Sequence, residues 1–128
     1  MLEVGMKLEV EKLVTDNDTA SKAASGAVEV LATPIMIAWM EEASLRLAQK
    51  ELEEGFTTVG TEVNIKHLKG TLVGKTLKII SVLKEIDRKK LVFDVEVLED
   101  GVAVGTGTHT RFIIDPVKFY EKLKNINK

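Results

Sequence analysis

The sequence contains no cysteine, only two prolines, and aromatic residues that make up just 5% of the chain. The absence of cysteine excludes disulfide bonds, thiol catalysis and cysteine-ligated metal sites. So few aromatic residues provide no stacking platform for single-stranded nucleic acid. The formal net charge of -2 gives no overall attraction to nucleic acid either. We therefore expect no nucleic-acid partner.

Long hydrophobic runs are also missing. No apolar stretch approaches the roughly 18 residues that suggest a membrane-spanning helix. The N-terminal stretch MLEVGMKLEVEKLV interleaves charged and apolar residues and has no signal-peptide core. We therefore expect a cytoplasmic protein with no membrane partner. Its 128 residues, 45% hydrophobic and 30% charged, fit one globular domain over 1–128.

The period of the apolar residues changes along the chain after Gly55. Before this point, alternation predicts one strand, and Thr33-Pro34 predicts the start of a long helix with Thr33 as its N-cap. After it, alternating runs separated by short polar or glycine breaks predict consecutive antiparallel strands. The predicted elements are a strand over 6–14, a helix from 33 to about 54, strands over 57–68, 76–87, 90–100 and 102–115, and a closing helix over 116–128.

The long helix is apolar around much of its circumference, so it must be covered on several sides. A curved sheet that wraps the helix would provide this cover. The sequence therefore predicts an α+β fold in which an antiparallel sheet of about five strands surrounds one long central helix.

Two adjacent glutamates follow the most apolar part of this helix. Glu42 has Arg46 four residues later, which predicts a solvated ion pair. Glu41 has Ile37 and Leu45 four residues away on either side and so falls within an apolar row. A buried unpaired carboxylate is costly. Glu41 is therefore either a rim residue that reaches water or a carboxylate with a chemical role.

The two histidines occupy different predicted strands. Alternation places His67 at the end of an inward-facing row that begins at Thr57, near the rim of the core. A lone strand histidine is more often structural, although a carboxylate on the facing helix favours a functional role. His109 and Arg111 share a face with two preceding glycines, which could admit a ligand. Their pattern alone favours ordinary surface residues.

Motifs for several other chemistries are missing from the chain. There is no P-loop, no dinucleotide-binding glycine turn after a strand, no nucleophile elbow and no HExxH zinc motif. Two distant histidines without clustered acids make a poor metal site. We expect no metal and no cofactor.

Three stretches, LATPIMIAWMEEA, TTVGTEVNIKHLKGTLVGKTL and GTGTHTRFII, resemble the hot-dog-fold thioesterases of the fluoroacetyl-CoA thioesterase-like family. The resemblance extends over about 6–119. It implies the hot-dog fold and a homodimer with acyl-CoA sites at the subunit interface. It further implies a catalytic set of Thr33, Glu41 and His67, with Gly60 and Arg111 lining the acyl pocket.

We therefore expect a dimeric, cofactor-independent acyl-CoA thioesterase that hydrolyses a short-chain acyl-CoA to the free acid and CoA. His67 would be the general base, Glu41 would orient it or attack directly, and Thr33 would be nucleophile or donor to the carbonyl. Segment 15–32, a candidate cover for the pocket, contains no aromatic residue, so we do not extend fluoroacetyl specificity to this chain. The alternative is a non-catalytic acyl-CoA-binding or regulatory module on the same fold. A hydratase or dehydratase is disfavoured by the lack of a sequence-local Asp/His pair.

Overall fold

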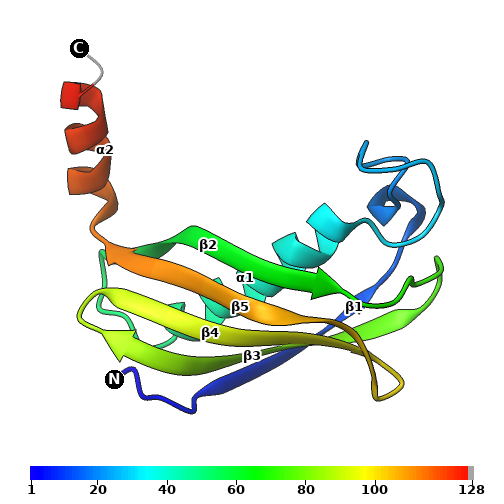
Figure 1. The fold of residues 1–128 in the computed structure, drawn as a ribbon. Helices are drawn as coiled ribbons and strands as arrows, with labels where there is room; N and C mark the ends of the chain where they lie inside the picture. The colour runs from blue at the N-terminus through cyan, green and yellow to red at the C-terminus, as the bar shows by residue number, and fades with distance from the viewer. Residues whose placement is uncertain (127–128) are drawn as a thin grey trace.

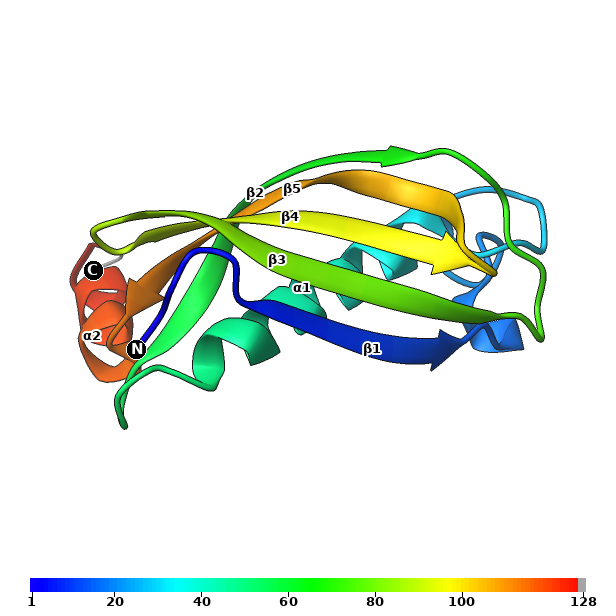
Figure 2. The ribbon, with the colours of Figure 1, turned by 90° about the horizontal axis from the view of Figure 1, so that it is seen from below.

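A five-stranded antiparallel sheet with one long helix lying along its face makes up most of the protein (Figure 1 and Figure 2). The structure is a computed structural model that describes residues 1–126. The last two residues of the predicted closing helix lie outside this range. The elements are β1 (Lys7–Leu13), a 3-10 turn η1 (Asp16–Asp18), α1 (Thr33–Gln49), β2 (Thr57–His67), β3 (Thr76–Asp87), β4 (Lys90–Glu99), β5 (Val102–Ile114) and α2 (Pro116–Ile126).

The strands are arranged in the order β1-β3-β4-β5-β2, and all neighbours are antiparallel. The three strands β3, β4 and β5 follow one another through tight connections, whereas β1 and β2 form the two edges. This arrangement confirms the predicted α+β class. It also leaves the outer edge of β2 without a neighbouring strand in the part of the chain that the structure describes.

Helix α1 packs against the sheet through buried side chains that include Met36, Met40 and Leu47. The helix comes especially close to β5 at Gly105. A Cβ atom at this glycine would lie 2.6 Å from the Sδ atom of Met36. The missing side chain therefore sets how near the helix can lie to the middle of the sheet.

The ends of α1 differ from the prediction. Ala32 is the N-cap and Thr33 is the first helical residue, so the Thr33 side chain is available for another partner. The helix ends at Gln49, about five residues earlier than expected. The segment 50–54 contains a single apolar residue, Leu52, among charged ones, so a continued helix would have had no apolar face to bury.

Strand β2 contains a β-bulge that the alternation pattern did not reveal. Its register against β5 shifts between Gly60 and Glu62, which leaves Thr61 as the extra residue. Before the bulge, the even-numbered Thr58 and Gly60 face the helix side, and after it His67 does. The prediction of one inward row starting at Thr57 is therefore wrong for the first half of the strand.

Helix α2 follows β5 and stands away from the end of the sheet (Figure 1). None of its residues is buried.

Within residues 1–126, no helix combines the length and the apolar character needed to cross a membrane.

We predict that Gly105→Ala destabilises the fold by about 1–3 kcal/mol, because the new methyl group overpacks the contact between α1 and β5. Chemical denaturation would measure the change in the free energy of unfolding. Gly70→Ala is the matched control, since a Cβ there would meet Val30 only at 3.9 Å, an ordinary contact. Equal stability of the two variants would contradict this account of the packing.

Candidate functional site

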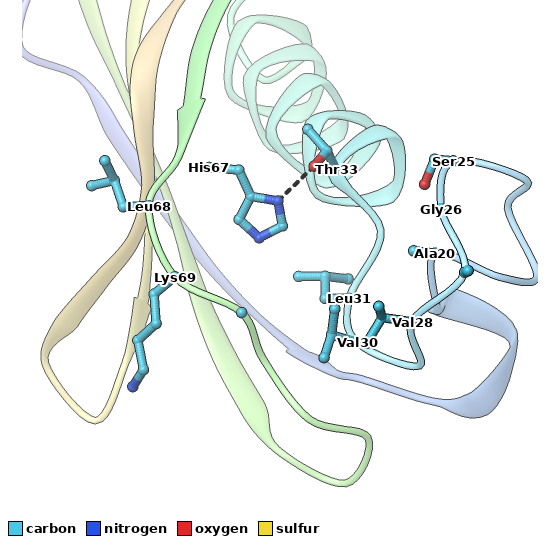
Figure 3. Close-up of a pocket in the computed structure, with 12 residues that line it drawn as sticks. Ala20, Ser25, Gly26, Val28, Val30, Leu31, Thr33, His67, Leu68 and Lys69 are labelled. Carbon is cyan, nitrogen blue, oxygen red and sulfur yellow. Dashed lines mark hydrogen bonds between the residues drawn. The ribbon is translucent and has the colours of Figure 1, made fainter.

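The first turn of α1 and the last residue of β2 meet at one end of the sheet. The hydroxyl oxygen of Thr33 lies 2.7 Å from Nδ1 of His67, a hydrogen-bond distance. The two residues come from segments 34 positions apart, and Figure 3 shows their side chains pointing toward each other. The first turn has no side-chain cap, and Pro34 contributes no N–H group. The remaining free N–H groups of this turn therefore lie beside the Thr33–His67 pair.

The other ring nitrogen of His67 is available. Nε2 is buried and has no hydrogen-bond partner among the described residues. Burial is the largest influence on the pKa of His67 and lowers it, while the backbone of Lys69 has a smaller, opposing effect. The Lys69 backbone nevertheless makes no hydrogen bond of ordinary geometry to Nε2. A histidine with a lowered pKa is neutral near pH 7 and can accept a proton.

A pocket of about 380 Å³ opens beside this pair. Its wall comes largely from the loop between β1 and α1, which is fastened at its base by backbone hydrogen bonds from Ala20 to Val30 and from Ala32 to Asp18. Most loop residues that face the pocket are small. The lining residues are Ala20, Ser25, Gly26, Ala27, Val28, Val30, Leu31, Thr33, His67, Leu68, Lys69 and Gly70 (Figure 3).

Glu41 lies about two turns further along α1 than Thr33 and likewise approaches β2. A Cβ atom built on Gly60 of β2 would lie 2.9 Å from Oε1 of Glu41. The same Cβ would lie 3.0 Å from Cε1 of His109 and 3.3 Å from Nη1 of Arg111. Gly60 is therefore the point where a carboxylate, an imidazole and a guanidinium converge, and any side chain there would displace them.

Arg111 is held by uncharged partners. Its Nε donates to the hydroxyl of Thr58 at 2.7 Å, and its Nη2 donates to the Thr58 carbonyl at 2.9 Å. Its Nη1 lies 3.1 Å from Nε2 of His109. Burial lowers the pKa of Arg111, and the Glu41 carboxylate opposes this effect. Glu41 is therefore the carboxylate that acts on the buried guanidinium.

Burial corrects the predictions for this group. Only 1% of His109 and 6% of Arg111 is exposed, so the expectation that they are ordinary surface residues is wrong. Conversely, 41% of the Glu41 side chain is exposed, so Glu41 is a rim carboxylate and is not buried. Both outcomes follow from the strand order. His109 and Arg111 are buried because their strand, β5, has β4 on one side and β2 on the other. Glu41 is exposed because it lies on the side of α1 that faces β2, the edge strand.

The partner of Glu42 also differs from the prediction. Its carboxylate lies 2.7 Å from the amino group of Lys12 on β1, and no ion pair with Arg46 occurs among the described residues. Glu42 therefore points to the opposite edge of the sheet from Glu41. The two adjacent glutamates therefore contact different edge strands, because neighbouring residues of a helix point in different directions.

The predicted site residues thus form two groups. Thr33 and His67 lie together at one end of β2, and Glu41, Gly60 and Arg111 lie together toward its other end. Eight residues of helix separate Thr33 from Glu41 by about 12 Å of rise, which prevents a direct hydrogen bond. Sequence reasoning missed the roles of His109 and Thr58 as partners of Arg111. The shared strand face of His109 and Arg111 was the available signal.

We predict that the protein loses thermal stability as the pH falls below about 6.5. Burial lowers the pKa of both His67 and His109 from the ordinary value of 6.5. The unfolded chain therefore binds more protons than the folded chain just below this pH. The stability contributed by the neutral rings is complete above pH 6.5 and declines as the pH falls toward the lowered pKa values of the two histidines.

Melting temperatures measured between pH 8 and pH 5 would test this prediction, and His67→Asn should weaken the dependence of the melting temperature on pH. A melting temperature that rises on acidification would contradict it.

Comparison with known proteins identifies the family and the fold of this chain. The fluoroacetyl-CoA-specific thioesterase family matches residues 14–117. The fluoroacetyl-CoA thioesterase of Streptantibioticus cattleyicolor is 34% identical over 97 residues, which cover 75% of this chain and 69% of the relative. A solved structure of the fluoroacetyl-CoA thioesterase FlK has a TM-score of 0.91 at 26% identity and covers 98% of this chain and 97% of its own. A hot-dog-like protein from Thermanaerovibrio acidaminovorans has a TM-score of 0.87 at 18% identity, covering 95% of this chain and 90% of its own. The chain therefore has the predicted hot-dog fold and belongs to the fluoroacetyl-CoA-specific thioesterase family.

Proposed function

We propose that this chain hydrolyses short-chain acyl-CoA thioesters to the free acid and CoA, as a single hot-dog domain over 1–128. The observation that carries this proposal is the hydrogen bond between Thr33 and His67, which stands at an uncapped helix start and faces an open pocket. Membership of a thioesterase family supports the same reaction. Because acyl-CoA thioesters are intracellular metabolites, we also propose a cytoplasmic location.

The chemistry follows from the environment of each group. Hydrolysis forms a bond between an incoming oxygen and the carbonyl carbon, breaks the C–S bond, and delivers a proton to the departing CoA thiolate. His67 is suited to move that proton, because burial favours its neutral form and one ring nitrogen has no protein partner. The Thr33 hydroxyl and the free N–H groups of the first turn of α1 are suited to polarise the carbonyl. We assign Glu41 to the same reaction, as a carboxylate that acts on the substrate opposite Gly60 and Arg111.

The pocket wall favours a small acyl group without selection for fluorine. Its loop supplies alanine, serine, glycine, valine and leucine, and none of the lining residues is Phe, Trp or Tyr. Tight discrimination between acetyl and fluoroacetyl requires close apolar packing around the acyl group, which small side chains on an open loop do not provide. We therefore propose short acyl-CoA thioesters as the substrate class, without fluoroacetyl specificity.

We further propose that the protein is a homodimer joined along β2. The middle of this edge strand is exposed on both faces, and Val63 remains 45% accessible there. Pairing the two β2 edges about a twofold axis would satisfy the unpaired backbone groups of both and would cover these residues.

A twofold axis near the centre of β2 would also join the two halves of the site. Gly60 lies four residues before Asn64 and His67 three residues after it, and the bulge at Thr61 accounts for the extra residue. An antiparallel pairing centred at Asn64 therefore sets Gly60 of one protomer opposite His67 of its partner. Glu41 adjoins Gly60, and Thr33 bonds His67. We propose that each complete site combines Glu41 of one protomer with the Thr33–His67 pair of the other.

We predict that the purified protein releases free CoA thiol from short acyl-CoA substrates and that Glu41→Gln lowers turnover by roughly 10²-fold or more, the scale of lost acid–base catalysis. His67→Asn should have a comparable effect. A thiol-release assay over acyl-CoA substrates of increasing chain length provides both measurements. Binding without thiol release in the unmodified protein would support the non-catalytic acyl-CoA-binding module instead.

The adjacent glutamate is the matched control for this experiment. Glu42→Gln removes the exposed ion pair with Lys12, which contributes at most about 1 kcal/mol to stability. It should leave turnover unchanged. Near-normal turnover in folded Glu41→Gln, or an equal loss in Glu42→Gln, would contradict the role given to Glu41.

We predict that mixing two inactive variants restores activity. In a heterodimer of Glu41→Gln and His67→Asn, a site shared between protomers carries both substitutions in one copy and neither in the other. Co-refolding the two variants should therefore yield about half of the normal turnover per heterodimer. If each site lay within a single protomer, both sites of the heterodimer would carry one substitution. Thiol release no higher than in the separate variants, with heterodimers present, would thus contradict the shared site.

A further inference from the structure

His109 is the most deeply buried ionisable residue near the proposed site, and the proposed reaction gives it no task. It is 1% exposed and lies on β5 between β2 and β4. Its Nδ1 lies 2.9 Å from the carbonyl oxygen of Glu62, and its Nε2 lies 3.1 Å from Nη1 of Arg111. Both ring nitrogens are therefore engaged with protein atoms, which leaves neither free to reach a substrate.

The identities of these partners determine the protonation of the ring. A guanidinium has only donors, so Nε2 must accept the hydrogen bond from Nη1 of Arg111. A carbonyl oxygen has only acceptors, so Nδ1 must carry the proton that it donates to Glu62. His109 is therefore neutral, with its proton on Nδ1. Burial, the main cause, and the adjacent Arg111 cation both lower the pKa of His109, which agrees with this assignment.

The same reasoning excludes an ion pair between His109 and Glu41. The two atoms that would form this pair, Nε2 of His109 and Oε1 of Glu41, are 3.9 Å apart. Such a pair would need a proton on Nε2, which would then face a donor N–H of Arg111 at 3.1 Å. Because the contact with Arg111 is shorter than the contact with Glu41, Nε2 is an acceptor and carries no proton. The positive charge that faces Glu41 is therefore that of Arg111.

Three acceptors thus fix the guanidinium in one plane. Thr58 accepts hydrogen bonds from Nε and Nη2, whereas among residues 1–126 only His109 accepts one from Nη1. Nη1 is also the nitrogen nearest the space above Gly60, where a Cβ would lie 3.3 Å from it. Without an acceptor at Nε2 of His109, this end of the guanidinium would be free to turn away from Glu41 and from the exposed backbone at Gly60.

We propose that His109 is a positioning residue whose neutral imidazole accepts a hydrogen bond from Arg111 and thereby directs the guanidinium toward Glu41 and the substrate space at Gly60. This inference rests on the proposed thioesterase site. His109 itself touches neither the substrate nor the reacting atoms, so its influence on the reaction passes through Arg111.

Two substitutions test the hydrogen bonds of the two His109 ring nitrogens separately. In His109→Asn, the side-chain amide can retain the hydrogen bond to Glu62 but has no acceptor that reaches Arg111. In His109→Gln, the longer side chain brings a carbonyl oxygen close to the former position of Nε2 and can accept from Nη1. We expect kcat/KM to fall about tenfold or more in His109→Asn. His109→Gln should recover most of that loss, and the melting temperatures of both folded variants show whether stability accounts for the difference.

A second measurement does not depend on turnover. In the unmodified protein, ¹⁵N NMR of the histidine rings should show the proton of His109 on Nδ1 at neutral pH. The side-chain NH signals of Arg111 should shift and broaden in His109→Asn more than in His109→Gln. If the unmodified protein releases no thiol but these signals behave as expected, the proposed function fails while the arrangement of His109 and Arg111 stands.

Two outcomes would overturn the proposal. The first is equal or higher kcat/KM in His109→Asn than in His109→Gln when both are folded. The second is a His109 ring protonated on Nε2 or on both nitrogens at neutral pH, because such a ring cannot accept from Arg111.

Discussion

The bulge at Thr61 determines which residues of β2 face the helix, and the arrangement of the site depends on it. A regular strand that brought His67 to the helix face would turn Thr58 and Gly60 to the opposite face, because side chains alternate strictly. The extra residue reverses the alternation once, so both ends of the strand present their functional positions to α1. The bulge also leaves the Glu62 carbonyl beside His109, where it accepts the Nδ1 proton. One inserted residue therefore links edge-strand geometry to the orientation of a buried ring.

The cluster around Gly60 contains few formally charged groups. Around Gly60, one cation and one carboxylate approach each other, and every other partner of Arg111 is neutral. Because its hydrogen-bond partners are neutral, the positive charge of Arg111 is not fully compensated, and it acts mainly on the partly exposed Glu41 carboxylate. At the other end, the Thr33–His67 pair carries no formal charge when His67 is neutral. In the proposed shared site, the two groups thus bring different chemistry to one substrate, polarisation and proton transfer from one group and charge from the other.

The sequence predicted the strands well because each has a clear alternation bounded by glycine or polar turns, and β3 has the predicted bounds. It predicted the start of α1 to within one residue, yet it misassigned Thr33 as a cap, because the competing partner, His67, is 34 residues away. Family resemblance supplied Glu41, Gly60 and Arg111 as site residues. The bulge was invisible, since Gly60, Thr61 and Glu62 fit an uninterrupted strand equally well. The burial of His109 depends on strand order, which local patterns do not contain.

The loop between β1 and α1 has a consequence for how this protein can change. Its base is tied by backbone hydrogen bonds that any side chain permits, and most of its tip, from Ser21 to Glu29, is exposed. Substitutions there cost the core little, although they reshape the wall of the pocket. The residues of the proposed catalytic set, by contrast, lie on α1 and β2, where changes disturb packing. In the proposed enzyme, acyl selectivity and folding stability are therefore encoded in separate stretches of the chain. We expect mutational libraries confined to the tip to change the preferred acyl group while the proposed hydrolytic groups stay intact.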